Sequence, residues 1–190
     1  ATRGAAEFSA GTFTHELNGS FFINTTDTAP MNVAGASKFI FNAPFTGAAG
    51  TSMGGDTTAT IAFADVTIRN PRGVTFNDNA QFSSGTTPTL VVIGGATLTP
   101  APTVIISGSG TLTGDATEGA GTVQVTRTAA TPDFDTQYTI ATRTLINSGS
   151  AGIHLTVDYS GSGAQTVNNP VGGYGHPKLG GSGIKTLPGT

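Results

Sequence analysis

Apolar and polar residues alternate with a period of two in many short runs along the chain. The clearest run covers residues 153–159, where Ile153, Leu155, Val157 and Tyr159 are separated by single polar residues. Because successive side chains of a β-strand point to opposite faces, this pattern predicts strands with one buried face. Further runs of this kind, which bring the expected total to about nine to eleven short strands, lie at 11–17, 20–26, 37–41, 57–70, 74–76, 122–126 and 135–147.

Two runs depart from simple alternation. In residues 57–70 the apolar phase changes after Phe63, which predicts either a β-bulge near Ala64–Asp65 or two separate strands. The apolar residues at 90–93 and at 104–106 are continuous, which is typical of strands covered on both faces.

Many short strands with frequent turn residues favour an all-β fold. We expect a single β-sandwich, of jelly-roll or immunoglobulin-like type, with an extended N-terminal strand and a Gly-rich C-terminal tail. No segment repeats at a fixed spacing, which argues against a solenoid or a propeller. The predicted organisation is an N-terminal arm or donor strand at 1–26, a sandwich core at 27–159 and the tail at 160–190.

Composition narrows the classes of function. The 190 residues include 28 Gly, no Cys and no Trp, and only 10% are charged, with a net charge of −3. Cysteine chemistry is therefore excluded, and the scattered Lys and Arg residues form no basic patch for nucleic acid. No apolar stretch approaches the roughly 20 residues of a membrane span. A surface so low in charge repels its own copies weakly, which favours close packing of identical subunits.

Candidate catalytic residues are few. Residues 50–54 match the G-x-S-x-G pattern of a hydrolase nucleophile, but no helical pattern follows, so a loop is expected there. His15, His154 and His176 do not show the spacing of metal ligands. We therefore predict that the protein is not an enzyme and has no catalytic residues.

Two acidic segments could supply oxygen ligands. Asn77–Asn79 is an oxygen-rich triplet, and Asp133 and Asp135 would point the same way on an extended chain. Calcium prefers such ligands, but turn chemistry alone accounts for Asn77–Asn79. We expect no metal and no cofactor, with calcium as the alternative.

Two short motifs concern covalent modification. Asn18 and Asn24 begin N-glycosylation sequons. The ending Leu187–Thr190 resembles the Gram-positive sortase signal after cleavage, which implies Thr190 as acyl donor. His176-Pro177-Lys178 resembles the pilin motif Tyr-Pro-Lys, which implies Lys178 as the amine. A chance match is the alternative for each.

The N-terminal region is rich in large apolar residues. They are Phe8, Phe13, Leu17, Phe21, Phe22 and Ile23. One hypothesis is that these residues form a donor strand that pairs with a neighbouring copy; the other is that they form the first strand of the chain's own sheet. In style the chain resembles Thr/Gly-rich, cysteine-free filament subunits that polymerise by strand donation.

These observations favour a structural subunit of an extracellular filament, such as a pilus, a fimbria or a biofilm fibre. Its expected partner is itself, with cell-surface or glycan contacts as a further option, and its expected location is extracellular or at the cell surface. A first residue Ala1 fits either a removed signal peptide or a removed initiator Met. The alternatives are a virion structural protein (capsid decoration or tail) and, after it, a carbohydrate-binding adhesin.

Overall fold

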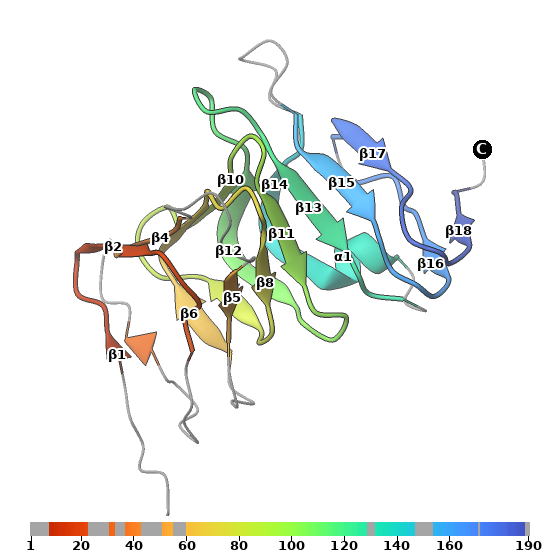
Figure 1. Ribbon diagram of the computed structural model, residues 1–190. Coiled ribbons are helices and arrows are strands. Elements are labelled where there is room, and N and C mark those ends of the chain that lie inside the picture. Colours follow the sequence, from red (N-terminus) through yellow and green to blue (C-terminus); the bar gives the residue numbers. More distant parts are fainter. Residues whose placement is uncertain are drawn as a thin grey trace, which may run out of the picture.

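The computed structural model describes residues 8–22, 31–32, 37–42, 51–54, 60–128, 132–146, 154–170 and 172–188. Almost all regular structure in these residues is β (Figure 1). The N-terminal half contains β1 (Phe8–Ser9), β2 (Thr14–Leu17), β3 (Met31–Asn32), β4 (Lys38–Phe41), β5 (Thr51–Met53), β6 (Ile61–Phe63), β7 (Asp65–Ile68), β8 (Val74–Phe76), β9 (Ala80–Phe82) and β10 (Thr89–Val92). The C-terminal half contains β11 (Thr97–Pro100), β12 (Ile106–Thr113), β13 (Thr122–Val125), the helix α1 (Asp133–Gln137), β14 (Tyr138–Thr144), β15 (Thr156–Tyr159), β16 (Gln165–Thr166), β17 (His176–Lys178) and β18 (Lys185–Thr186).

The chain winds as a coil, and each turn of the coil stacks on the turn before it. β7, β8 and β9 follow one another around one turn, and β10 then lies beside β7 in parallel register, with Asp65 opposite Thr89. β8 is followed one turn later by β11, and β9 by the start of β12. The pairings between all these strands are parallel. The fold is therefore a parallel β-solenoid in its described part.

Three ladders of strands run along the coil. The first contains β2, β4, β7, β10, the second half of β12 and the second half of β14. The second contains β5, β8, β11, β13, β15 and β17. The third contains β6, β9 and the first halves of β12 and β14. Because β12 and β14 cross from the third ladder to the first, these two ladders form one curved sheet, a parallel half-barrel.

The interior is filled by columns of inward-facing side chains that run along the axis. The rings of Phe39, Phe63 and Phe82 follow one another with centroid separations of 5.5 Å and 5.8 Å, and all three are fully buried. A second column lies behind the second ladder. In register it consists of Phe21, Met53, Phe76, Pro100, Val125, Tyr159 and Leu179. Stacking of like residues in this way buries apolar surface continuously from turn to turn.

The crossing of β12 between ladders depends on a glycine. Gly108 has a φ of 113°, and a Cβ placed on it would lie 2.2 Å from the carbonyl oxygen of Phe82. The register of β12 with β14 shifts between Gly108 and Thr111. Only glycine combines this backbone conformation with so close an approach of two chains, so the bend is set at this residue.

The expected β-sandwich is wrong, because a sandwich consists of antiparallel sheets and these ladders are parallel. Period-two alternation reports which face of a strand is buried, but it does not report which strand lies beside it. The argument against a solenoid is also wrong. Lys38 pairs with Asp65, Asp65 with Thr89, and Thr111 with Thr142, so the turns differ in length and leave no fixed repeat in the sequence.

Three local expectations are corrected or decided. Residues 160–190 are not an extended tail in their described part, since they supply β16, β17 and β18. The phase change after Phe63 marks two strands, β6 and β7, in different ladders. Residues 90–93 are not covered on both faces, because β10 alternates between buried and half-buried side chains.

Candidate functional site at the two ends of the coil

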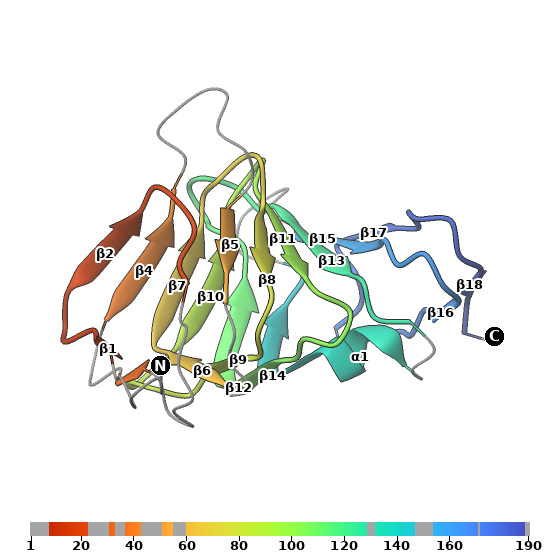
Figure 2. The same cartoon turned by 60° about the horizontal axis from the view of Figure 1, so that its bottom comes forward.

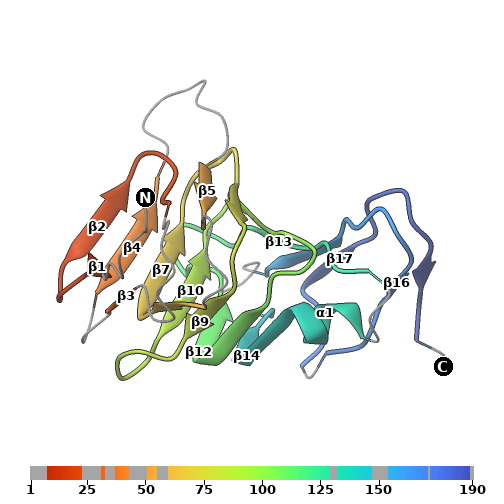
Figure 3. The ribbon, with the colours of Figure 1, turned by 90° about the horizontal axis from the view of Figure 1, so that it is seen from below.

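The first and last coils lie at opposite ends of the molecule (Figures 2 and 3). We call residues 8–22 the first coil and residues 165–188 the last coil. Among the described residues, six large apolar side chains are exposed, and five of them belong to these two coils. They are Phe13 and Phe22 in the first coil and Leu179, Ile184 and Leu187 in the last coil.

The first coil presents an open strand edge. β2 pairs with β4, where the carbonyls of Phe13 and Leu17 accept hydrogen bonds from the N–H groups of Lys38 and Asn42 at 3.0 Å and 2.9 Å. Alternate residues of a parallel strand direct their main-chain groups to opposite edges. The main-chain groups of the intervening residues, such as Glu16, therefore face away from β4, and no described strand pairs with that edge.

The predicted donor-strand residues divide into two groups. Leu17 and Phe21 are half-buried and pack against the core, and the Phe21 ring lies 5.8 Å from that of Phe39. Phe13 and Phe22 are 71% and 66% exposed. The segment thus lies in the chain's own first coil and still leaves two phenyl rings exposed.

Of the remaining donor-strand residues, Phe8 lies in β1, which pairs with β3, and Ile23 lies outside the described residues. Phe21 is also joined to β5 through its main chain. Its N–H donates to Ser52 at 2.8 Å, and its carbonyl accepts from Gly54 at 3.0 Å.

The last coil presents two further strand edges. The N–H of His176 in β17 donates to Leu155 at 3.3 Å, so the main-chain groups of Pro177 and Leu179 face outward by alternation. In β18 the carbonyls on either side of Lys185 accept hydrogen bonds from β16, both at 2.8 Å, and the main-chain groups of Lys185 face outward. Neither outer edge has a described strand beside it.

A groove of about 430 Å³ opens at this end of the coil. We call it the end groove. Its lining is mostly apolar and includes Val167, Tyr174, Pro177, Leu179, Leu187 and Pro188. Side chains that would form the interior of a further turn are therefore open to solvent here.

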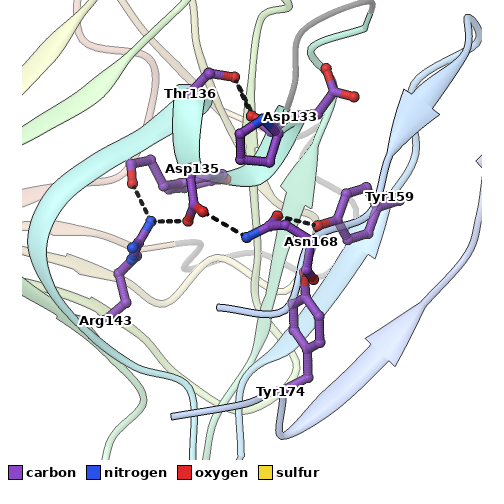
Figure 4. A network of polar contacts seen from close by, with 9 residues as sticks. Asp133, Asp135, Thr136, Arg143, Tyr159, Asn168 and Tyr174 are labelled. Atoms are coloured by element: carbon purple, nitrogen blue, oxygen red, sulfur yellow. Dashed lines mark hydrogen bonds and ion pairs between the residues drawn. The ribbon is translucent and has the colours of Figure 1, made fainter. Parts of the chain in front are cut away.

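A network of polar contacts holds the last coil against α1 (Figure 4). The Asp135 carboxylate accepts hydrogen bonds from Arg143 at 2.5 Å and from Asn168 at 2.7 Å. Tyr159 donates to the Asn168 side chain at 3.1 Å, and Tyr174 donates to the Asn168 main-chain carbonyl at 2.7 Å. The hydroxyls of Tyr159 and Tyr174 are themselves 2.5 Å apart. Asn168 is the central residue of this network.

Burial raises the pKa of Tyr159 and that of Tyr174, and the contact between the two hydroxyls raises the pKa of Tyr174 further. Burial alone raises the pKa of Tyr138 well above its ordinary value. All three tyrosines therefore remain neutral hydrogen-bond donors far above neutral pH.

Two buried side chains join the last coil to earlier segments. Asp133 of α1 binds the main chain of the last coil, and Gln165 of the last coil binds the main chain of earlier segments. Asp133 accepts a hydrogen bond from the N–H of Thr166 at 2.5 Å. Gln165 donates to the carbonyls of Val125 and Arg127 at 2.8 Å and 2.7 Å, and its carbonyl oxygen accepts from Gly161 at 3.0 Å. These bonds give the N–H of Thr166 and the carbonyl of Arg127 their hydrogen-bond partners.

The two acidic segments do not form one site. Asp133 and Asp135 lie on α1 and bind different partners, so the expected extended chain with both carboxylates on one side is wrong. Asn79 accepts a hydrogen bond from the N–H of Ile105 at 2.8 Å. Within the described ranges, no three His, Cys, Asp or Glu side chains are placed to hold a metal ion.

Among the other sequence candidates, two histidines come together. His154 and His176 become neighbours on adjacent turns, with ring centroids 5.5 Å apart, although their spacing gave no such signal. Thr51–Met53 forms β5 instead of the expected loop, and the Ser52 hydroxyl donates to that of Ser20 at 3.1 Å.

The modification candidates are only partly described. Asn18 is exposed directly after β2, and Lys178 is paired with the buried Asp158 carboxylate at 3.0 Å. Asn24 and Thr190 lie outside the described residues.

Sequence reasoning missed the end groove and the Asn168 network. The residues of the Asn168 network come from β15, α1, β14 and the last coil, which lie far apart in the chain. The groove residues lie in the last coil, where Pro177 and Leu187 were noted only as parts of modification motifs. The exposed rings of the first coil were recognised because they are large apolar residues in short succession.

Comparison with known proteins gives no identification. No family model matches the chain, and neither curated sequences nor solved structures give a match. In the part of the chain that is described, no helix has the length and apolar character of a membrane span.

Proposed function

We propose that this chain is a structural subunit of an extracellular filament in which identical copies join end to end through the first and last coils. The observation that carries this proposal is the position of the exposed apolar side chains. Five of the six large ones in the described residues belong to these two coils, at opposite ends of the axis.

Exposed strand edges with adjacent apolar side chains are typical sites of pairing between chains, because main-chain hydrogen bonds and apolar burial act together. Here the two ends are different surfaces of one molecule. A contact between unlike ends leaves a free end on each copy, so it repeats without closing and generates a filament. The low charge of the chain, 10% of residues, limits the repulsion between stacked copies.

This end-to-end contact between copies differs from strand donation, in which one copy inserts a strand into the sandwich of the next. The first coil is already paired with β4 and β5 through β2 and Phe21. Each added copy would therefore continue the ladders with all of its own turns, with no segment removed from its own domain.

Sedimentation velocity over a range of concentrations, with electron microscopy of the heaviest fraction, tests this proposal. We expect species that grow with concentration and appear as rods of uniform width. A chain that stays monomeric at every concentration would contradict the proposal.

A proline at the open edge of β2 tests the strand contact. Glu16→Pro removes an outward N–H and leaves the bonds to β4 intact, so we expect it to shift the distribution to monomers. Glu16→Gln removes the same charge but keeps the N–H, and should assemble like the parent chain. Equal assembly of both variants would exclude pairing at this edge.

A further inference from the structure

We propose that consecutive copies continue the second ladder in register, so that Ser20–Phe22 of one copy lies beside Lys178–Gly180 of the next. This inference rests on the proposed function and specifies which surfaces meet. It assigns the end groove to the Phe21 ring in the first coil of a second copy.

The register follows from the columns of the solenoid. Phe21 lies opposite Met53 at one end of the inward column behind the second ladder, and Leu179 follows Tyr159 at the other end. If the column continues between copies, Phe21 is placed on Leu179, which lines the end groove. Ser20 is then opposite Lys178 on the outer face, and Phe22 is opposite Gly180.

The main-chain groups match in this register. The main-chain groups of Phe21 face β5 within its own copy, so those of Ser20 and Phe22 face outward. Ser20 would donate to the Pro177 carbonyl and accept from the N–H of Leu179. Phe22 would donate to the Leu179 carbonyl. Of Pro177 these bonds use only the carbonyl group. The N–H that proline lacks is therefore not needed for this pairing.

The side chains are also compatible. A groove of about 430 Å³ has room for a phenyl ring, since a cavity of about 150 Å³ accommodates benzene. Gly180 has no side chain to collide with the Phe22 ring. Residues 176–187 include Lys178 and Lys185 and no acid, whereas residues 8–22 include Glu16 and no Lys or Arg. The charge of Lys178 is compensated by Asp158, so Lys185 and Glu16 give the two surfaces opposite charge.

Disulfide trapping tests the register directly, because the chain contains no cysteine of its own. Adjacent parallel strands are about 4.8 Å apart, which falls within the Cα separation that a disulfide spans. We would mix separately purified Ser20→Cys and Lys178→Cys chains, oxidise them mildly and analyse them by non-reducing electrophoresis and mass spectrometry. The expected product is a heterodimer as the main cross-linked species.

A register control uses Ser20→Cys mixed with His176→Cys. This pair is two residues out of step, which places the Cα atoms about 8 Å apart, beyond disulfide reach. We expect at least a tenfold lower yield of heterodimer than with Lys178→Cys. Equal yields would overturn the proposed register.

Lys178→Cys removes the ion-pair partner of the buried Asp158 carboxylate. A second pair of cysteine variants therefore controls for a change in the structure of the last coil. Phe21→Cys and Leu179→Cys would be opposite each other in the same register, and neither native side chain is fully buried. The register is overturned if filaments form but neither in-register pair cross-links. It is equally overturned if Ser20→Cys alone forms homodimers as readily, because the ends would then meet like to like. Absence of any association, by contrast, overturns the proposed function itself.

Discussion

The middle turns and the last coil of this solenoid are held together by different forces. In residues 61–125 the contacts are apolar columns, and the rings of Phe63 and Phe82, for example, stack between neighbouring turns. In the last coil, polar side chains bind main-chain groups, with Gln165 and Asn168 at the centre. The difference shows that a parallel solenoid can add a turn whose apolar columns are incomplete if buried polar groups satisfy its main chain.

Glycine makes the second arrangement possible. A Cβ on Gly183 would lie 1.8 Å from the carbonyl oxygen of Gly163, so two main-chain segments touch where a side chain would otherwise separate them. With little apolar area to bury there, side-chain hydrogen bonds to the main chain must fix the position of the last coil.

The largest expected effect comes from the apolar middle. Phe63→Ala removes a fully buried ring between two others, and we expect it to lower the free energy of unfolding by about 3–5 kcal/mol in urea titrations. Phe22→Ala is the matched control, because its ring is 66% exposed and should change the stability of the monomer little. A loss below 1 kcal/mol for Phe63→Ala would show that the column is not the main source of stability.

A smaller and local effect is expected in the last coil. Gln165→Leu removes three hydrogen bonds and leaves the buried carbonyl of Arg127 without its partner, whereas the carbonyl of Val125 still accepts from Ser160; the loss should cost about 2 kcal/mol. Hydrogen exchange followed by mass spectrometry should show faster exchange in residues 161–188 and little change in 61–125. Gln81→Leu on the exposed face of β9 is the control. An equal increase in the exchange rate of both regions would contradict the view that the middle turns and the last coil are stabilised separately.

High pH should destabilise the network around Asn168. The folded-state pKa values of Tyr138, Tyr159 and Tyr174 are raised above that of an unfolded tyrosine. Their contribution is complete below about pH 10, the unfolded value, and is lost as the pH rises through the folded values. Absorbance titration should show no tyrosine ionising near pH 10 in the folded chain and all three in urea. Normal titration in the folded chain would contradict the burial of these hydroxyls.

The smallest effect is expected at a surface ion pair of the middle turns. Arg69 and Glu118 form a pair whose side chains are 36% and 41% exposed. Glu118→Gln should change stability by less than about 1 kcal/mol, because solvent and salt screen exposed charges. Thermal unfolding at low and high salt measures this change. A larger loss of stability would mean that this ion pair, and not apolar stacking, holds the loop that contains Glu118.

Part of this structure could be predicted from residue patterns. The runs containing Ile61 and Phe63, or Val123 and Val125, are strands with one buried face, as expected. The exposed Phe13 and Phe22 were recognised as candidates, whereas Tyr174 and Asn168 were not. Alternation is a local property of the chain, but the Asn168 network joins β15, α1 and the last coil, which only the winding of the chain brings together.

The sequence by itself determined that the protein is built of short strands, which side chains face the core, and that the first coil carries surplus apolar residues. The tertiary structure decided that the strands lie parallel and wind as a coil, and that an apolar groove forms at the opposite end of the coil. The physical reason is that strand polarity and register depend on hydrogen bonds between distant segments. Because the turns differ in length, neither strand polarity nor register produces a repeat at fixed spacing in the sequence.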